Sequence, residues 1–169
     1  MKNIVLIGMP GSGKTTLSQT LSKTLQRPNV DLDTYIVENY GMSIPEMFAI
    51  GEEYFRERET LCCQKVANTK GHIIATGGGI IKNPNNIKYL KETGCIVYLD
   101  RPIESIIKDL DVSTRPLLNN DVETLYDLYR ERHQKYLEAS DIHIINTKDI
   151  ATITKKIIEQ VKYYQKVIT

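Results

Sequence analysis

Five short runs of apolar residues divide the chain, and each ends at a glycine, an aspartate or an asparagine. They cover residues 4–8, a short stretch around Val30, and residues 72–77, 95–100 and 142–146. Because these runs are apolar at consecutive positions, both faces of the strands they form should be buried. The pattern is typical of a parallel sheet that is covered by helices on both sides.

Between these runs, hydrophobic residues recur at helical spacing. The spacing predicts helices over residues 15–25, 52–68, 84–93, 103–110, 122–139 and 151–167. The last of them places Ile153, Ile157 and Val161 on one stripe, which should dock on the sheet. Strands that alternate with helices through short connections predict an α/β fold.

Two segments depart from this alternation. Residues 41–51 contain Pro45 and two glycines, so a short helix with turns is expected there. Residues 109–121 are polar and contain Arg115-Pro116 and Asn119-Asn120, and polar loops of this kind often serve as lids. No repeat or linker-like stretch divides the chain, so residues 1–169 are expected to form a single domain.

Charge and composition narrow the function classes. Lys and Arg number 22 against 21 Asp and Glu, so the net charge of +1 gives no electrostatic case for nucleic acid or for a membrane surface. No apolar run approaches the roughly 18 residues of a membrane span. Cys62, Cys63 and Cys95 lack the spacing of a metal site and fit a reducing compartment. A cytoplasmic protein is expected, and it should be a monomer because no coiled-coil heptad occurs.

Residues 8–15 read GMPGSGKT and match the phosphate-binding pattern G-x-x-x-x-G-K-[ST] at every position. An apolar strand precedes the motif and a helical pattern follows it, as this motif requires. Glycines let backbone N–H groups turn toward phosphate oxygens, and the helix start adds its positive dipole end. Lys14 would reach the β- and γ-phosphates, and the Thr15 hydroxyl would bind Mg²⁺. The motif predicts a site for a nucleoside triphosphate with Mg²⁺.

Candidate acceptor groups follow two other strands. Asp31 and Asp33 are two residues apart, so on a strand they would point to the same face beside the phosphates. One carboxylate would then suit the water shell of Mg²⁺ and the other a general base; alternatively, they cap a helix. Gly77, Gly78 and Gly79 remove every Cβ at another strand end, so a small ligand could lie against the backbone there.

Arginine is scarce, with seven residues against fifteen lysines. Only a guanidinium group grips a carboxylate or phosphate through two parallel hydrogen bonds, so each arginine is informative. Three arginines lie on helix starts or loops around the predicted site: Arg56, Arg115 and Arg132. The others are expected to be solvated surface residues: Arg27, Arg58, Arg101 and Arg130.

These motifs, in this order and spacing, resemble those of the shikimate kinase family over nearly the whole chain. They are Gly11-Ser12-Gly13-Lys14-Thr15-Thr16, Asp31-Leu32-Asp33, Phe55-Arg56-x-x-Glu59, Gly77-Gly78-Gly79, Arg115-Pro116-Leu117-Leu118, and Arg132 with Tyr136 and Asp141. The resemblance implies a five-stranded parallel sheet with helices on both faces, of the P-loop nucleoside-monophosphate-kinase type. It also implies a phosphotransferase that moves the γ-phosphoryl group of ATP to the 3-hydroxyl of shikimate, a step of chorismate and aromatic amino-acid biosynthesis.

The resemblance further implies a role for each matching residue. The P-loop, residues 8–16, would bind ATP through Gly11, Ser12, Gly13, Lys14, Thr15 and Thr16. Thr15 and Asp31 would hold Mg²⁺, and Asp33 would be the base. Arg56 and Arg132 would clamp the shikimate carboxylate, with Gly77, Gly78 and Gly79 against the ring. A substrate-binding helical segment would span residues 33–61, and a lid over residues 109–121 would bring Arg115 to the transferring phosphate, so that Lys14, Asp33 and Arg115 are catalytic.

The chain departs from the family pattern in places, and other functions stay open. Gln134-Lys135 replaces the usual Pro-Leu after Arg132, and Lys108 takes a place often held by arginine. One alternative is another small-molecule kinase of this fold, of the gluconate or nucleotide type; a nucleotide kinase would need more arginines for its second phosphate group. The other is an inactive nucleotide-binding relative, which should have lost Lys14, Asp33 or a clamp arginine.

Overall fold

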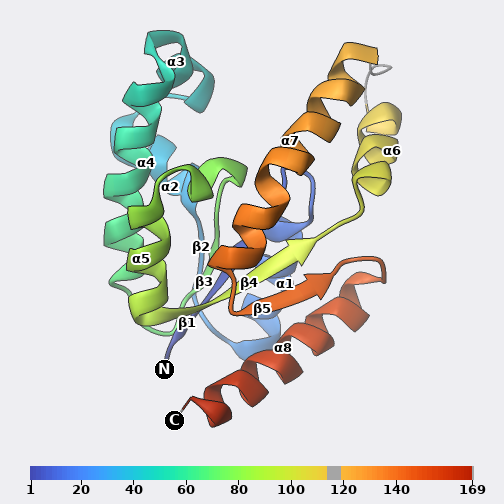
Figure 1. The fold of residues 1–169 in the computed structure, drawn as a ribbon. Coiled ribbons are helices and arrows are strands. Elements are labelled where there is room, and N and C mark those ends of the chain that lie inside the picture. Colours follow the sequence, from blue (N-terminus) through green and yellow to red (C-terminus); the bar gives the residue numbers. More distant parts are fainter. Residues whose placement is uncertain (114–118, 169) are drawn as a thin grey trace.

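The computed structural model describes residues 1–113 and 119–168 (Figure 1). Strands and helices alternate along the chain. In chain order they are β1 (Asn3–Ile7), α1 (Lys14–Leu25), β2 (Asn29–Asp31), α2 (Leu32–Tyr40), α3 (Ile44–Ile50), α4 (Glu52–Ala67), β3 (Ile73–Ala75), the 3-10 helix η1 (Gly78–Lys82), α5 (Pro84–Thr93), β4 (Gly94–Asp100), α6 (Ile103–Ser113), α7 (Asn119–Ala139), β5 (Ile142–Ile145) and α8 (Ile150–Val167).

The five strands form one parallel sheet in the order β2-β3-β1-β4-β5. β1 is central, and its Ile4 lies opposite Ile73 of β3 on one side and Cys95 of β4 on the other. The predicted α/β fold with a five-stranded parallel sheet is therefore confirmed. Because all strands run the same way, their carboxyl ends meet at one edge, where open α/β sheets bind ligands.

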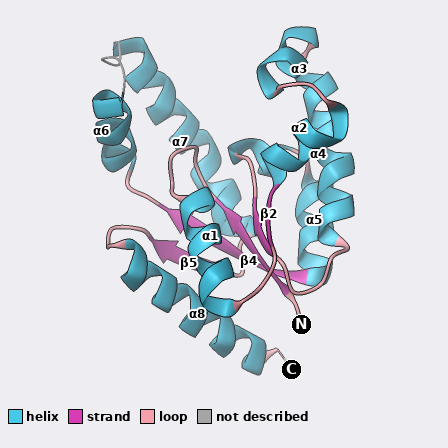
Figure 2. Cartoon of the chain, turned by 180° about the vertical axis from the view of Figure 1, so that it is seen from behind, coloured by secondary structure: helices cyan, strands magenta, loops and turns pink. Residues whose placement is uncertain are grey.

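Helices cover both faces of the sheet, and the side chains of β1 alternate between the two cores. Ile4 and Leu6 pack in a core with residues of α1 and α8, the helices that lie in front of the sheet in Figure 2. Val5 and Ile7 belong to the opposite core, which contains residues of α4, α5 and α7. All residues of β1 and β4 are buried, as the continuous apolar runs predicted.

The three cysteines are free and buried, and they divide between these two cores. Cys62 and Cys63 on α4 lie in the core that contains Val5, whereas Cys95 on β4 lies in the core that contains Ile4. Burial raises the pKa of Cys63 and of Cys95 to about 12. The three cysteines therefore act as core side chains.

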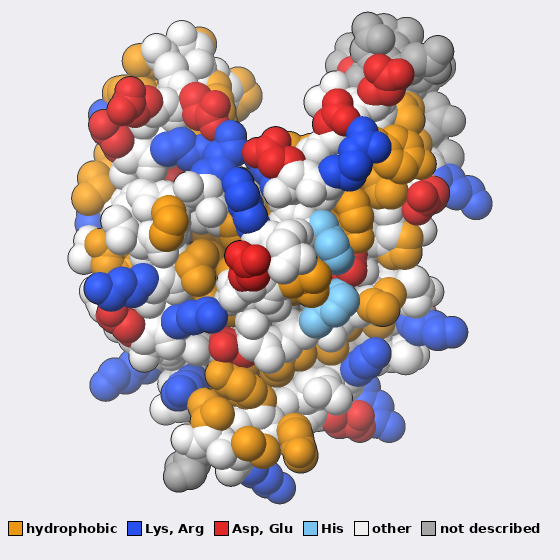
Figure 3. Space-filling model, viewed as in Figure 1, with side chains coloured by type: hydrophobic (Ala, Val, Ile, Leu, Met, Phe, Trp, Pro, Cys, Tyr) orange, Lys and Arg blue, Asp and Glu red, His pale blue; other side chains and the backbone are white. Residues whose placement is uncertain are grey.

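Two groups of helices rise beyond the carboxyl edge of the sheet. One consists of α2, α3 and the start of α4, and the other of α6 and the start of α7 (Figure 1). The space-filling view shows the molecule hollowed between them, with Lys and Arg side chains around the floor of the hollow (Figure 3). No helix in the two described stretches is long and apolar enough to cross a membrane.

The sequence predicted residues 41–51 correctly but residues 109–121 only in part. The short helix expected within residues 41–51 is present as α3, where Ser43 and Glu46 form a capping box. In residues 109–121 a polar loop was expected, but α6 continues through Ser113 and α7 begins at Asn119. The helix is longer than expected because its apolar residues keep their helical spacing past residue 109, where the chain becomes polar. Residues 114–118, with Arg115, lie outside the described part of the chain.

Asn3 is a buried polar residue that joins the start of β1 to distant segments. Its amide nitrogen donates to the Thr69 carbonyl at 2.8 Å, to the Ala67 carbonyl at 3.3 Å and to the Thr93 hydroxyl at 3.4 Å. Its amide oxygen accepts from the His72 N–H at 2.9 Å. One side chain therefore satisfies main-chain groups at the end of α4 and at the entry to β3.

Replacing this side chain tests that role. Asn3→Ala is expected to lower the free energy of unfolding by about 2–3 kcal/mol, because it removes the bonds of this buried amide to the partly buried Thr69 carbonyl and His72 N–H. Urea denaturation measures the change. The matched control is Asn39→Ala on the exposed side of α2, where the amide donates to the Tyr35 carbonyl; a change within about 0.5 kcal/mol is expected. Equal unfolding midpoints for the two variants would contradict the prediction.

Candidate active site

The P-loop connects β1 to α1 and needs glycine at two of its turns. Gly11 and Gly13 have φ angles of +80° and +96°, in the left-handed region that glycine adopts without strain. Gly13 is also the N-cap of α1, and no side chain in the described residues caps that helix start. The first N–H groups of α1 are therefore left to bind an anion, as the motif predicted.

Lys14 is buried at the start of α1, and its ammonium group bends back into the loop. It donates to the main-chain carbonyls of Gly8 at 2.7 Å and Met9 at 2.8 Å, and it lies 3.4 Å from the Ser12 hydroxyl. Desolvation lowers the pKa of Lys14 to about 8, although the nearby carboxylates oppose the shift. A phosphate group would supply the negative charge that this site lacks.

Asp31 and Thr15 meet beside the phosphate loop. The Thr15 hydroxyl donates to one Asp31 oxygen at 3.0 Å, while the other accepts from the Thr34 N–H at 3.1 Å. Asp31 therefore caps α2 and also presents a carboxylate oxygen next to a hydroxyl. Hydroxyl and carboxylate oxygens are the hard ligands that Mg²⁺ prefers, so this pair fits the predicted metal position. In the described residues no group of three or more His, Cys, Asp or Glu forms a complete metal cage.

The prediction that Asp31 and Asp33 share one face of a strand is wrong. β2 ends at Asp31, and Asp33 lies in the first turn of α2, so the two-residue periodicity of a strand does not apply. The first turn of the helix still brings Asp33 to the site: a Cβ on Gly77 would lie 2.9 Å from its Oδ1. Burial, with a smaller contribution from Asp31, raises the pKa of Asp33 against the opposing charges of Lys14 and Arg56.

Arg56 on α4 is held by two aromatic rings and two carboxylates. Its guanidinium carbon lies 5.0 Å from the centroid of the Phe55 ring and 5.6 Å from that of Phe48. Nη1 donates to Glu59 at 2.8 Å and Nε to Glu52 at 3.4 Å. Glu59 is fully buried, and its burial raises its pKa despite the bond to Arg56. This support fixes the guanidinium at the wall of a pocket.

Arg132 projects from α7 and is 7 % exposed. Its Nε atom is buried and has no hydrogen-bond partner in the described residues. A buried N–H without a partner is costly, so a ligand oxygen at this place would gain a strong, charge-assisted bond. One turn further along α7, the Tyr136 hydroxyl donates to the Gly78 carbonyl at 2.6 Å and ties α7 to the glycine segment.

The three consecutive glycines are required by the side chains of the site itself. A Cβ on Gly78 would lie 2.8 Å from Pro10 and 3.1 Å from Nη1 of Arg132, and one on Gly79 would overlap the Arg56 guanidinium. The sequence suggested that these glycines make room for a ligand. In the structure they make room for the arginines and for Asp33, which then face the same space.

That space is a pocket of about 190 Å³ beside the P-loop. All six predicted substrate-binding residues line it, together with Glu59, Pro10 and apolar side chains: Asp33, Arg56, Gly77, Gly78, Gly79, Arg132, Glu59, Pro10, Ile44, Phe48 and Phe55. Its volume is below the range of about 300–1,000 Å³ typical of pockets for drug-sized ligands. Its small size and its two guanidinium groups suit a small anionic ligand.

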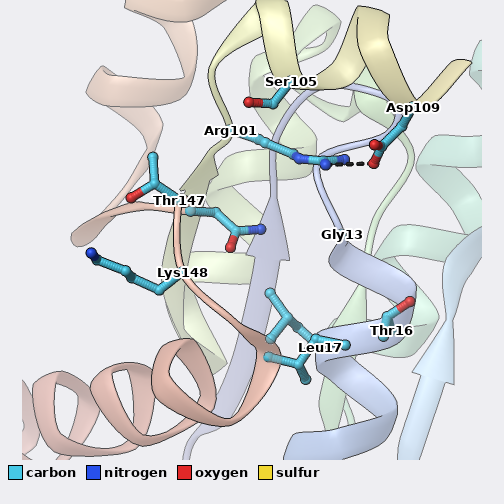
Figure 4. Close-up of a pocket in the computed structure, with 10 residues that line it drawn as sticks. Gly13, Thr16, Leu17, Arg101, Ser105, Asp109, Thr147 and Lys148 are labelled. Atoms are coloured by element: carbon cyan, nitrogen blue, oxygen red, sulfur yellow. Dashed lines mark hydrogen bonds and ion pairs between the residues drawn. The ribbon is translucent and has the colours of Figure 1, made fainter. Parts of the chain in front are cut away.

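A second pocket, of about 350 Å³, opens on the other side of the P-loop (Figure 4). Its lining comes from the P-loop and α1, from α6 and the residue after β4, and from the segment that joins β5 to the start of α8: Gly13, Thr16, Leu17, Arg101, Ser105, Asp109, Asn146, Thr147, Lys148 and Ile150. The Asn146 amide donates to the Ser12 carbonyl at 2.8 Å and fixes the β5–α8 segment against the loop. A hollow of about 340 Å³ along Lys14 and Thr15 shares Gly13, Thr16 and Arg101 with this pocket.

Arg101 is the functional candidate that the sequence analysis missed. It was expected to be a solvated surface residue, yet its Nη1 donates to the Gly11 carbonyl at 3.0 Å and its side chain lines the second pocket. One signal could have found it: Arg101 directly follows the strand over residues 95–100, at the edge where ligands gather. Arg130 is exposed and pairs with Asp127 on the same helix, as a surface arginine would.

The arrangement suits phosphoryl transfer to a small anionic acceptor. A phosphate-binding loop and a pocket of nucleoside size lie on one side, and two guanidinium groups line a small pocket on the other. Lys14 and Asp33 lie close enough to influence each other's pKa where the two compartments meet. The predicted contribution of Arg115 falls on residues that the structure does not describe, and it stays a prediction.

Comparison with known proteins points to one family. The family model described as "Shikimate kinase" matches residues 10–162. A shikimate kinase of Clostridium botulinum (strain Alaska E43 / Type E3) is 42% identical over 158 residues, which cover 93% of this chain and 96% of that protein. The structure of shikimate kinase from Acinetobacter baumannii in complex with shikimate matches with a TM-score of 0.87 and 32% identity, over 96% of this chain and 94% of that one. The shikimate kinase of Aquifex aeolicus matches with a TM-score of 0.84 and 31% identity, over 95% and 96%. This chain belongs to the shikimate kinase family.

Proposed function

We propose that this protein transfers the γ-phosphoryl group of ATP to the 3-hydroxyl of shikimate. The observation that carries the proposal is the small pocket beside the P-loop, which Asp33, Arg56 and Arg132 line together. A neutral sugar would offer no anionic partner to Arg132, whose buried Nε lacks a hydrogen bond in the described residues. A nucleotide acceptor would need further arginines for its phosphate group, and among the described residues Arg56 and Arg132 are the arginines that line this pocket. The carboxylate and hydroxyl groups of shikimate match the charges present.

Two arginines would bind the shikimate carboxylate. The unpaired Nε of Arg132 needs an acceptor, and Arg56 is kept in place by Glu59 and the rings of Phe48 and Phe55. Guanidinium–carboxylate pairs form two parallel hydrogen bonds and gain strength in a partly dry pocket. The carboxylate would therefore orient the ring and aim one hydroxyl group at Asp33.

Asp33 would act as the general base. The 3-hydroxyl oxygen attacks the γ-phosphorus, the bond to the β–γ bridging oxygen breaks, and ADP leaves, while the hydroxyl proton passes to Asp33. Burial raises the pKa of Asp33 and so brings it nearer to that of an effective base. Lys14 would leave the carbonyls of Gly8 and Met9 to stabilise the charge on the phosphates.

Thr15 and Asp31 would hold Mg²⁺, and the second pocket would hold the adenosine. Mg²⁺ supplies neutralisation of the phosphate charge when it is bound. Asn146 and Thr147 offer polar groups for the base in a pocket that the loop after β5 closes on one side. The enzyme would act as a monomer in the cytoplasm, and the free, buried cysteines fit that reducing compartment.

Arg132→Ala tests the carboxylate clamp. It should weaken shikimate binding by about 2–5 kcal/mol, the range for truncating one partner of a buried charge pair, and leave ATP binding near normal. Calorimetry with shikimate, with its carboxamide and with ATP measures the affinity for each ligand. The matched control is Arg130→Ala, two residues away and exposed, which should bind shikimate like the wild type. If Arg130 carries the loss, or if the wild type binds both compounds equally, the clamp is wrong.

Asp33→Asn tests the base. The amide keeps the shape of the side chain but cannot accept the proton, so kcat should fall by about 10²–10⁴, more than the affinity for shikimate falls. In the wild type, kcat should decline as the pH drops through the raised pKa of Asp33, because the protonated form is inactive. Asp31→Asn serves as the comparison and should instead raise the Mg²⁺ concentration required. Equal effects on kcat and on shikimate affinity would count against a base.

The pH dependence of nucleotide binding tests Lys14. Its pKa of about 8 in the free protein should rise when phosphates bind, so ADP binding at about pH 9 should be coupled to proton uptake. The affinity should therefore fall as the pH rises above 8, and stay level just below that pH, where Lys14 is already charged. Calorimetry in two buffers of different ionisation enthalpy counts the protons. An absence of uptake at about pH 9 would place Lys14 away from the phosphates.

A further inference from the structure

Arg101 lies where the two hollows on the nucleotide side of the P-loop meet. It lines both the adenosine-sized pocket and the hollow along Lys14 and Thr15. Its Nη1 donates to the Gly11 carbonyl, and its Nη2 pairs with Asp109 of α6, the contact drawn as a dashed line in Figure 4. The guanidinium group is therefore held by main chain on one side and by a carboxylate on the other.

The two partners of this ion pair are unequally buried. The Arg101 side chain is 24% exposed, whereas that of Asp109 is 62% exposed. An exposed ion pair contributes little to stability, so the carboxylate can be displaced at small cost. A guanidinium group carries five N–H donors, and these two contacts leave donors available. An anion could thus take the place of Asp109 while the bond to Gly11 remains.

The charge of the pocket also favours this exchange. Among the described residues that line it, Arg101 and Lys148 are cationic and Asp109 is the one acidic side chain. Asp109 would both occupy the guanidinium group and repel an incoming phosphate. A phosphate accepts two parallel hydrogen bonds from an arginine, which matches the planar fork of Arg101.

We infer that Arg101 binds the nucleotide phosphates next to the ribose and that Asp109 competes with them for the guanidinium group. This rests on the proposed function, since it requires a nucleotide in the second pocket. Arg101 lines that pocket and the P-loop hollow but is not among the residues of the shikimate pocket. It therefore contacts the phosphates that stay on the nucleotide rather than the transferred group.

Calorimetry with ADP and with adenosine tests this role in the full-length protein. Arg101→Ala should weaken ADP binding roughly tenfold, the factor expected from losing a hydrogen bond to a charged group, and leave adenosine binding unchanged. Arg101→Lys should recover part of the loss, because it keeps the charge without the fork. Asp109→Asn should bind ADP several-fold more tightly than the wild type, since it frees the guanidinium group, and an unchanged affinity would overturn the competition. Arg130→Ala is the matched control.

Arg101→Ala and Asp109→Asn should change the affinity for ADP in opposite directions. This distinguishes an arginine that binds phosphate from one that only holds α6 to the P-loop. If Asp109→Asn weakens ADP binding as much as Arg101→Ala does, the pair only holds α6 to the P-loop and the inference is overturned. It is also overturned if Arg101→Ala binds ADP normally, or if adenosine binding falls equally. The proposed function fails on a different result, namely no phosphorylation of shikimate by a wild type that binds ADP, and the role of Arg101 would survive that outcome.

Discussion

The burial of β1 and β4 along their whole length is the constraint that organises this molecule. With apolar cores on both faces, a charged side chain in the middle of either strand would lose its hydration without gaining a partner. Charged side chains are therefore confined to strand ends, and the parallel direction collects the carboxyl ends at one edge. The P-loop after β1, Asp31 at the end of β2, the glycines after β3 and Arg101 after β4 all follow from this restriction.

At that edge, unlike charges support one another in a poorly hydrated space. Lys14 lies near Asp31 and Asp33, and Arg56 is paired with Glu59. Each charged group has part of its cost of burial offset by a neighbour, but the balance is incomplete: the pKa of Lys14 is lowered and that of Asp33 is raised. The buried Nε of Arg132 also lacks a hydrogen-bond acceptor among the described residues. The desolvated Lys14 and the unpartnered Nε of Arg132 both favour an incoming anion, whereas the buried carboxyl of Asp33, with its raised pKa, does not.

The sequence predicted the sheet and the P-loop well because both depend on local patterns. Apolar runs and a contiguous motif are visible without knowledge of distant contacts. The prediction was wrong for Asp33, since the helix α2 begins directly after a strand of three residues and periodicity cannot be read over so short a stretch. It was also wrong for Arg101, because the bond to the Gly11 carbonyl ninety positions earlier cannot be read from the sequence, and the position of Arg101 directly after β4 was its one local signal. The roles given to Arg56 and Arg132 came from the family resemblance, and the structure brings both to one pocket.

The accessibility of the three cysteines to a thiol reagent reports partial unfolding of the protein. Cys62 and Cys63 are shielded on one side of the sheet and Cys95 on the other, and Cys63 and Cys95 have a pKa of about 12 that keeps them as unreactive thiols while the cores stay closed. Alkylation of either group requires the covering helices to separate from the sheet. The order in which a thiol reagent modifies them therefore reveals which of the two layers detaches first, without any added label.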